Sequence, residues 1–176
     1  MGHNENWRVV CDITRTCAID LFEAYGIALR DCETCELTDD ATIMAAVGFA
    51  GEEMRGALAI SLATSAVKAS NVITASPTAD QDRDWTGELA NQLLGRLKNR
   101  LVRFGAQVSM GTPLVFAGSR FLVHSPKQSP NIRLGFTTDH GPIEVWIDTV
   151  FSPDTVLVEA SDPADACEEE GTLLFF

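Results

Sequence analysis

The sequence predicts an α+β domain in which helices pack on one antiparallel sheet. Three observations support this class: helical periodicity near the N-terminus, a long amphipathic segment in the middle, and two pairs of short apolar runs joined by turns. A chain of 176 residues is expected to form one domain with a substantial core. We expect this domain to span residues 1–161, and residues 162–176 to form an acidic C-terminal tail with an apolar end.

The first half of the chain predicts a helix, a hairpin and a short helix. A helix over residues 5–29 is indicated by apolar side chains at three- to four-residue spacing, with Gly26 near its end. Residues 41–63, "ATIMAAVGFAGEEMRGALAISLA", contain two apolar runs joined by a Gly-Glu-Glu turn, which is typical of a hairpin. The small residues of its second run, Ala57, Ala59 and Ser61, could lie under a packed helix. Residues 64–75 are expected to form a short helix.

The second half predicts a long helix followed by strands. Thr78 and Gln81 have the spacing of a capping box, so we expect the helix to run from residue 79 to 104 and to end at Gly105. Strands are expected at residues 107–110, 114–123, 132–137 and 143–151. The last two flank "TDHG" and alternate in polarity, which predicts a hairpin with one buried face.

The long helix is predicted to present an unusual polar side. At about 100° per residue, and with Asp84 set at zero, Glu88 falls at about 40°, Asn91 at about 340°, Gly95 at about 20° and Lys98 at about 320°. We call these five residues the outer stripe. The opposite side of the helix contains Trp85 and a row of leucines, so we expect the stripe to face outward.

Two residues of the outer stripe are poor choices for a merely solvated helix face. Charged side chains are routine there, and the simplest interpretation of the stripe is an ordinary exposed surface. However, Asn is unfavourable in a helix interior, and Gly95 costs about 1 kcal/mol relative to alanine. A glycine leaves a dent in the helix surface, where the backbone of another protein could fit. The pattern therefore favours a docking surface with a carboxamide and a carboxylate at its centre.

The charge of the chain limits its partners. The formal net charge is −12, which argues against binding to nucleic acid or to an anionic membrane. No apolar run approaches the roughly 18 residues that span a bilayer, and the N-terminus lacks the apolar segment of a signal peptide. We therefore expect a cytoplasmic protein.

Few residues suggest catalysis by the chain alone. Cys32 and Cys35 form a single C-x-x-C pair, which is weak support for a thiol or metal site because the three histidines lie far away in sequence. No Ser/His/Asp or Cys/His constellation and no phosphate-binding glycine motif is evident. Asn91 is neither a nucleophile nor a base, but its carboxamide can hold a water molecule by accepting and donating hydrogen bonds. Positioning of water is a real catalytic role in phosphoryl hydrolysis.

These residues together resemble the motif of the CheC/CheX/FliY family of chemotaxis phosphatases. The motif is Asp84-x-x-x-Glu88-x-x-Asn91, followed by Pro113 and then Gly118. The resemblance runs from about Ala57 to Thr149 and includes "GALAISLATSAVKASNVI" and "GELANQLLGRLKNRL". One copy of the motif is present, because Glu23 in the first helix is followed three residues later by Gly26 instead of Asn. The chain therefore looks like the single-site CheX type.

The resemblance implies a CheC-like fold, an antiparallel sheet packed against two long helices. It also implies dephosphorylation of a phosphorylated CheY-like response regulator, with Asn91 placing the attacking water and Glu88 pairing with a lysine of the regulator. Asp84 would have a supporting role, either ordering the helix face or touching the partner. We expect the dent at Gly95 and the side chain of Lys98 to belong to the same partner-binding surface. The chain would need no cofactor of its own, because the regulator would supply the Mg²⁺, and a homodimer is plausible.

Two other functions compete with this interpretation. One is a catalytically silent CheC-like adaptor that binds a response regulator or a motor component. The intact pair of Glu88 and Asn91 favours the phosphatase, because an adaptor has no need for a residue that positions water. The other is a sensor of a small ligand or of thiol oxidation that uses Cys32 and Cys35.

Overall fold

The computed structural model describes residues 2–32, 42–72, 76–119, 121 and 131–160. Its elements in chain order are α1 (Gly2–Glu23), β1 (Arg30–Asp31), β2 (Thr42–Ala50), β3 (Met54–Ala63), α2 (Thr64–Ser70), α3 (Ala79–Val102), β4 (Ser109–Met110), β5 (Leu114–Gly118), β6 (Asn131–Thr138) and β7 (Gly141–Phe151). The strands form one antiparallel seven-stranded sheet in the order β1-β6-β7-β3-β2-β4, and β5 also pairs with β2. The predicted α+β class is confirmed.

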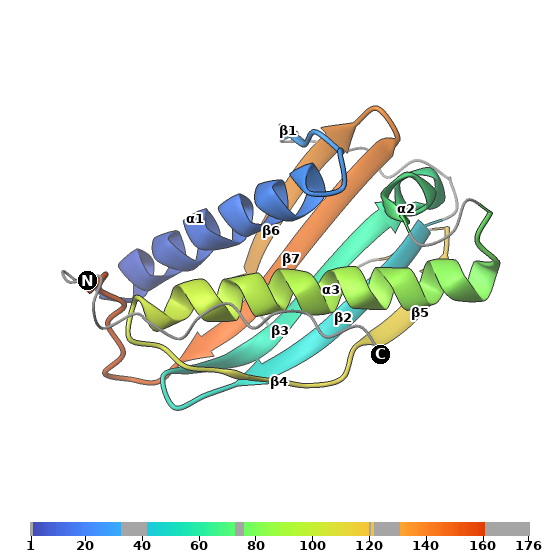
Figure 1. Ribbon diagram of the computed structural model, residues 1–176. Helices are drawn as coiled ribbons and strands as arrows, with labels where there is room; N and C mark the ends of the chain where they lie inside the picture. The colour runs from blue at the N-terminus through green and yellow to red at the C-terminus, as the bar shows by residue number, and fades with distance from the viewer. Residues whose placement is uncertain (1, 33–41, 73–75, 120, 122–130, 161–176) are drawn as a thin grey trace.

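The two long helices α1 and α3 lie side by side on one face of the sheet, and α2 sits where β3 ends (Figure 1). The core lies between these two layers and is built mainly from aliphatic side chains of α3 and of the central strands. Those of α3 are fully buried at Leu89, Leu93, Leu94, Leu97 and Leu101. The predicted apolar side of the long helix therefore faces the sheet.

The ends of the helices follow local capping chemistry. The predicted capping box of α3 is present: the Gln81 amide donates to Thr78 Oγ1 at 3.3 Å, and the Thr78 amide donates to Gln81 Oε1 at 2.9 Å. Helix α1 ends at Glu23, before the predicted residue 29, because Gly26 adopts a φ of 73° and the Ile27 amide bonds back to the Phe22 carbonyl. The residues after this turn include the short strand β1, which the sequence analysis did not predict.

Two expectations about the sheet are wrong. The helix-facing side of β3 consists of Leu58, Ile60 and Leu62, which are fully buried, and the small residues point to the opposite face. The larger side chains bury more apolar area against α3, which explains the choice of face. Strand β7 is buried on both faces, not one, because Glu144 and Trp146 are almost inaccessible on the side away from the helices.

The segment after β7 is tied to the start of α1 by Asn6. This side chain is fully buried; it donates to the Thr155 carbonyl at 2.8 Å and accepts from the Leu157 amide at 2.9 Å. Trp7 also contacts the ring of Phe151, edge to face, at a centroid distance of 5.6 Å. The N-terminal turns of α1 thus form part of the domain core. The predicted tail, residues 162–176, lies outside the described residues.

Replacing Asn6 with alanine is expected to lower the free energy of unfolding by about 2 kcal/mol, because it leaves two backbone groups without partners. Urea unfolding measures this change. The control is Asn99→Ala, which makes the same substitution at an exposed position of α3. Equal stability of the two variants would contradict the role assigned to Asn6.

Candidate functional site

The outer stripe of α3 lies on the side of the helix away from the sheet. Asp84, Glu88 and Lys98 are exposed, and Asn91 and Gly95 are partly buried, whereas Trp85 on the opposite side is 5% exposed. The outward orientation predicted from the helical angles is therefore confirmed. The functional roles of these five residues stay predictions.

The part of α3 that contains Glu88 is held close to β5 by a glycine that the sequence analysis did not single out. A Cβ atom at Gly87 would lie 3.2 Å from Val115 Cγ2 and 3.7 Å from Pro113 Cγ. Gly87 is buried, so its missing side chain allows the helix to approach the strand and the preceding loop. Pro113, the proline that the sequence analysis singled out, thus lies against α3 at Gly87, one residue before Glu88. The signal in the sequence that could have indicated this close contact was a glycine inside a predicted helix.

The side chains of Glu88 and Asn91 differ in their surroundings. Within the part of the chain that the structure describes, the Asn91 carboxamide makes no hydrogen bond or ion pair with another residue. Glu88 Oε1 accepts a hydrogen bond from Gln92 Nε2 at 3.0 Å. The stripe therefore presents a restrained carboxylate beside a carboxamide whose donor and acceptor are both available to an external group.

Gly95 leaves open space on the surface of α3. A Cβ atom placed there would meet no heavy atom within 4 Å. Neither close packing nor a positive φ angle requires a glycine at this position. Gly95 thus lowers the helix propensity of α3, and nothing in the described part of the chain requires a glycine at this position.

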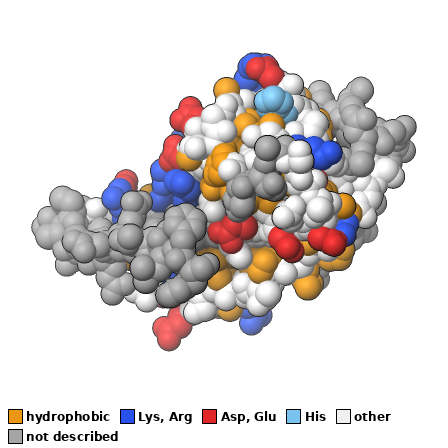
Figure 2. All heavy atoms as spheres, turned by 45° about the vertical axis from the view of Figure 1, so that its right-hand side comes forward, with side chains coloured by type: hydrophobic (Ala, Val, Ile, Leu, Met, Phe, Trp, Pro, Cys, Tyr) orange, Lys and Arg blue, Asp and Glu red, His pale blue; other side chains and the backbone are white. Residues whose placement is uncertain are grey.

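Charge along α3 is divided between its two halves. The first half exposes Asp80, Asp84 and Glu88, of which Asp80 is paired with Arg83, and the second half contains Lys98 and Arg100. Figure 2 brings forward the side of the molecule where α3 begins in Figure 1, and both acidic and basic side chains are spread over its surface. The order of charges suits the helix dipole. It also gives the acidic half of the stripe the sign that attracts a basic group of a partner.

Two of the three cysteines in the described residues, Cys11 and Cys17, have thiols that are poorly suited to chemistry. Burial raises the pKa of Cys17 to about 11, and burial also raises the pKa of Cys11, so both are protonated at neutral pH. Cys32 follows β1, and its amide bonds to the Gly135 carbonyl. Cys35 lies outside the described residues, which leaves the predicted C-x-x-C site untested. No group of three or more metal-ligating side chains occurs among the residues that the structure describes.

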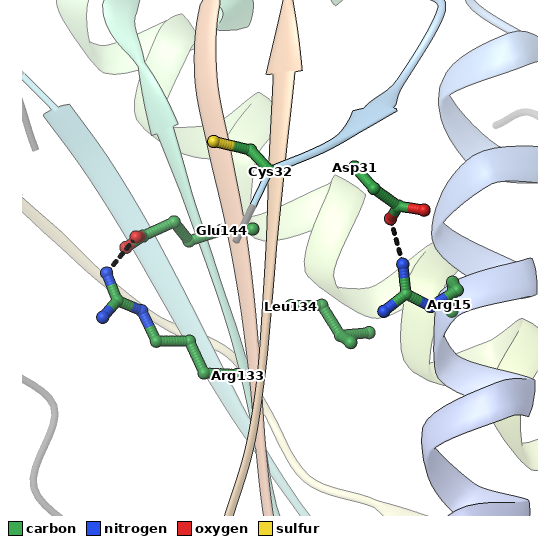
Figure 3. A pocket seen from close by; sticks show the side chains of 7 residues that line it. Arg15, Asp31, Cys32, Arg133, Leu134 and Glu144 are labelled. Carbon is green, nitrogen blue, oxygen red and sulfur yellow. Dashed lines mark hydrogen bonds and ion pairs between the residues drawn. The ribbon is translucent and has the colours of Figure 1, made fainter. Parts of the chain in front are cut away.

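A pocket of about 510 Å³ lies at the edge of the sheet, away from the outer stripe. Figure 3 shows Arg133 and Glu144 on one side of the strands and Arg15 and Asp31 on the other, with Cys32 between them. Each arginine forms an ion pair with the neighbouring carboxylate. The charges of the pocket are thus already paired within the chain, and no residue of α3 lines it.

The fold defined by this sheet and these two helices is that of the CheC-like chemotaxis proteins. A crystal structure of the chemotaxis protein CheX from Vibrio vulnificus matches with a TM-score of 0.72 and 18% identity, covering 80% of this chain and 96% of that one. A CheX structure from Desulfovibrio desulfuricans matches with a TM-score of 0.64 and 20% identity, covering 81% and 99%. A CheX-CheY-BeF3-Mg complex from Borrelia burgdorferi matches with a TM-score of 0.56 and 17% identity, covering 80% and 94%.

The sequence itself identifies the family. The family model described as chemotaxis phosphatase CheX matches residues 43–137, which is more than half of the chain. The chain belongs to the CheX family. A comparison with curated protein sequences gives no match. Among the described residues, no helix is both long and apolar enough to cross a bilayer.

Proposed function

We propose that this chain removes the phosphoryl group from the phosphorylated aspartate of a CheY-like response regulator. The observation that carries this proposal is the carboxamide of Asn91, which bonds to no other described residue and lies one helical turn from Glu88 on an outward face of a chain of the CheX family. The matching complex from Borrelia burgdorferi pairs a CheX with CheY, BeF3 and Mg. A partner of this kind supports the proposal, because a carboxamide on an outward helix face becomes a closed site only when a second protein covers it.

In the proposed reaction, water attacks the phosphorus atom of the aspartyl phosphate. The P–O bond to the aspartyl oxygen breaks, and the products are the free carboxylate and inorganic phosphate. Asn91 would accept a hydrogen bond from the water through Oδ1 and orient its oxygen toward phosphorus. It would supply orientation and no proton transfer, because a carboxamide is neither an acid nor a base at neutral pH.

The other residues of the stripe are proposed to dock the regulator. Glu88 would pair with a lysine of the partner, and Asp84, Gly95 and Lys98 would contact the surface around it. The Mg²⁺ is proposed to arrive with the regulator, as the family resemblance implies. The homodimer implied by the resemblance stays a prediction, which analytical ultracentrifugation tests.

The direct test measures phosphate release from phosphorylated CheY-like regulators with and without the protein. We expect release to accelerate in proportion to the amount of protein added. Tight binding with an unchanged rate of release would instead identify the silent adaptor.

Glu88→Lys is expected to weaken binding of the regulator by about tenfold, because two positive groups would then face each other across an exposed contact. The loss should be larger at low salt, where screening is weaker. Titration with a regulator loaded with Mg²⁺ and BeF₃⁻ at two salt concentrations measures both effects. Unchanged affinity would remove Glu88 from the interface.

A further inference from the structure

Glu88 is the end of a chain of contacts that begins in the core. Tyr25 Oη donates a hydrogen bond to Gln92 Oε1 at 2.7 Å, and Gln92 Nε2 donates to Glu88 Oε1 at 3.0 Å. Tyr25 belongs to the turn that closes α1, whereas Gln92 and Glu88 lie one turn apart on α3. The side chain of Glu88 is therefore linked to a second element of the fold.

Chemistry fixes the direction of both hydrogen bonds. An ionised carboxylate can only accept, so Gln92 must turn its amide nitrogen toward Glu88. The carbonyl oxygen of Gln92 then faces Tyr25, whose hydroxyl is the donor. A flipped carboxamide would place two acceptors together at Glu88, and only one orientation of Gln92 satisfies all three groups.

The ring of Tyr25 is itself fixed. It lies edge to face against Trp85, with a centroid distance of 5.2 Å and an interplanar angle of 82°. Trp85 is buried, and its Nε1 donates to Ser70 Oγ at 2.9 Å. The contact with Trp85 restrains the Tyr25 ring, and the packing of α1 against α3 therefore sets the position of the Tyr25 hydroxyl.

We propose that Gln92, anchored by Tyr25, is a positioning residue that holds the Glu88 carboxylate in the orientation needed to receive the regulator. This inference rests on the proposed function, in which Glu88 engages a lysine of the partner. A glutamate on an open helix face loses rotamer freedom when it docks, and a side chain held in advance loses less. The Gln92–Glu88 hydrogen bond is exposed and the Tyr25–Gln92 bond is only partly buried, so both contribute little to folding and the effect falls mainly on binding.

The first test uses Tyr25→Phe and Gln92→Leu. Tyr25→Phe removes one oxygen and keeps the ring on Trp85. Each variant is expected to raise the Kd for a CheY-like regulator loaded with Mg²⁺ and BeF₃⁻ by about three- to tenfold, with an unchanged thermal midpoint. Gln107→Leu, the same change at an exposed residue remote from the stripe, is the matched control and should bind normally. Normal affinity of both Tyr25→Phe and Gln92→Leu would overturn the proposal.

A double-mutant cycle separates positioning from a merely structural role. In a Glu88→Ala background, Tyr25→Phe and Gln92→Leu should produce no further loss of affinity, because the group they orient is gone. A full additional loss in that background would show that they act elsewhere and would also overturn the proposal. At saturating regulator, the rate of phosphate release should change by less than about twofold in either variant, since Asn91 is untouched.

An independent readout does not require the regulator. The side-chain amide of Gln92 should be coupled to Glu88: its protons should exchange with solvent more slowly than those of the exposed Gln107. This protection should vanish in Glu88→Ala and shrink in Tyr25→Phe. Failure of the proposed function, with no acceleration of phosphate release by the wild type, leaves this coupling observable. Absence of the coupling in the wild type would contradict the positioning role even where the phosphatase activity is normal.

Discussion

Asn91→Ala is expected to lower the rate of phosphate release from the bound regulator by about 10² or more, the scale of losing a group that orients the reactants. The loss should fall on the rate at saturating regulator, because the docking residues are unchanged. Single-turnover measurements with the chain in excess over phosphorylated regulator isolate this step. An unchanged accelerated rate would rule out water positioning by Asn91.

The stability of the same variant provides its control. Alanine is a better helix former than asparagine, so Asn91→Ala should be as stable as the wild type or slightly more stable. Asn99→Ala makes the same change at an exposed position about two turns beyond Asn91 on the same helix. It should leave the rate at saturating regulator unchanged. Loss of activity together with loss of stability would point to a folding defect and not to the proposed chemistry.

Gly95→Leu is expected to lower kcat/KM for the phosphorylated regulator by about 10- to 100-fold, because a protruding side chain would separate two surfaces that must fit closely. The fold should tolerate it, since a Cβ atom there meets nothing within 4 Å. Titration with the BeF₃⁻-loaded regulator and thermal unfolding measure the two effects separately.

Gly95→Ala is the graded companion of this variant. It should stabilise α3 by about 1 kcal/mol through helix propensity, and its small methyl group should weaken docking much less than leucine does. Normal turnover by Gly95→Leu would show that the dent at Gly95 is not part of the docking surface.

The sequence was most informative where a long periodic pattern decides the outcome. The orientation of α3 followed from simple helical angles, because Trp85 and the leucines occupy one continuous side. The capping box at Thr78 was recognisable because its two hydrogen bonds are local in sequence. The hairpin of β6 and β7 was also predictable from local sequence. In its turn, Thr138 Oγ1 accepts from the His140 amide and donates to the Gly141 carbonyl.

The features that were missed depend on contacts between distant segments. Glu144 occupies a position that alternation assigns to solvent, yet it is buried in an ion pair with Arg133 from the neighbouring strand. In β3 both faces are apolar, so periodicity alone could not decide which one meets the helices. Tyr25 and Gln92 are 67 positions apart, and nothing local to either residue indicates that they touch.

The pairing of Asn6 with Thr155 and Leu157 has a consequence for synthesis of the protein. Asn6 leaves the ribosome well before its two partners, which are separated from it by 149 and 151 positions. The Asn6 carboxamide therefore stays hydrated, and α1 cannot complete its contacts, until Thr155 and Leu157 have been translated. Contacts this far apart close slowly. Helix α1 of the nascent chain is expected to remain open to proteases and chaperones until the segment that follows β7 has emerged.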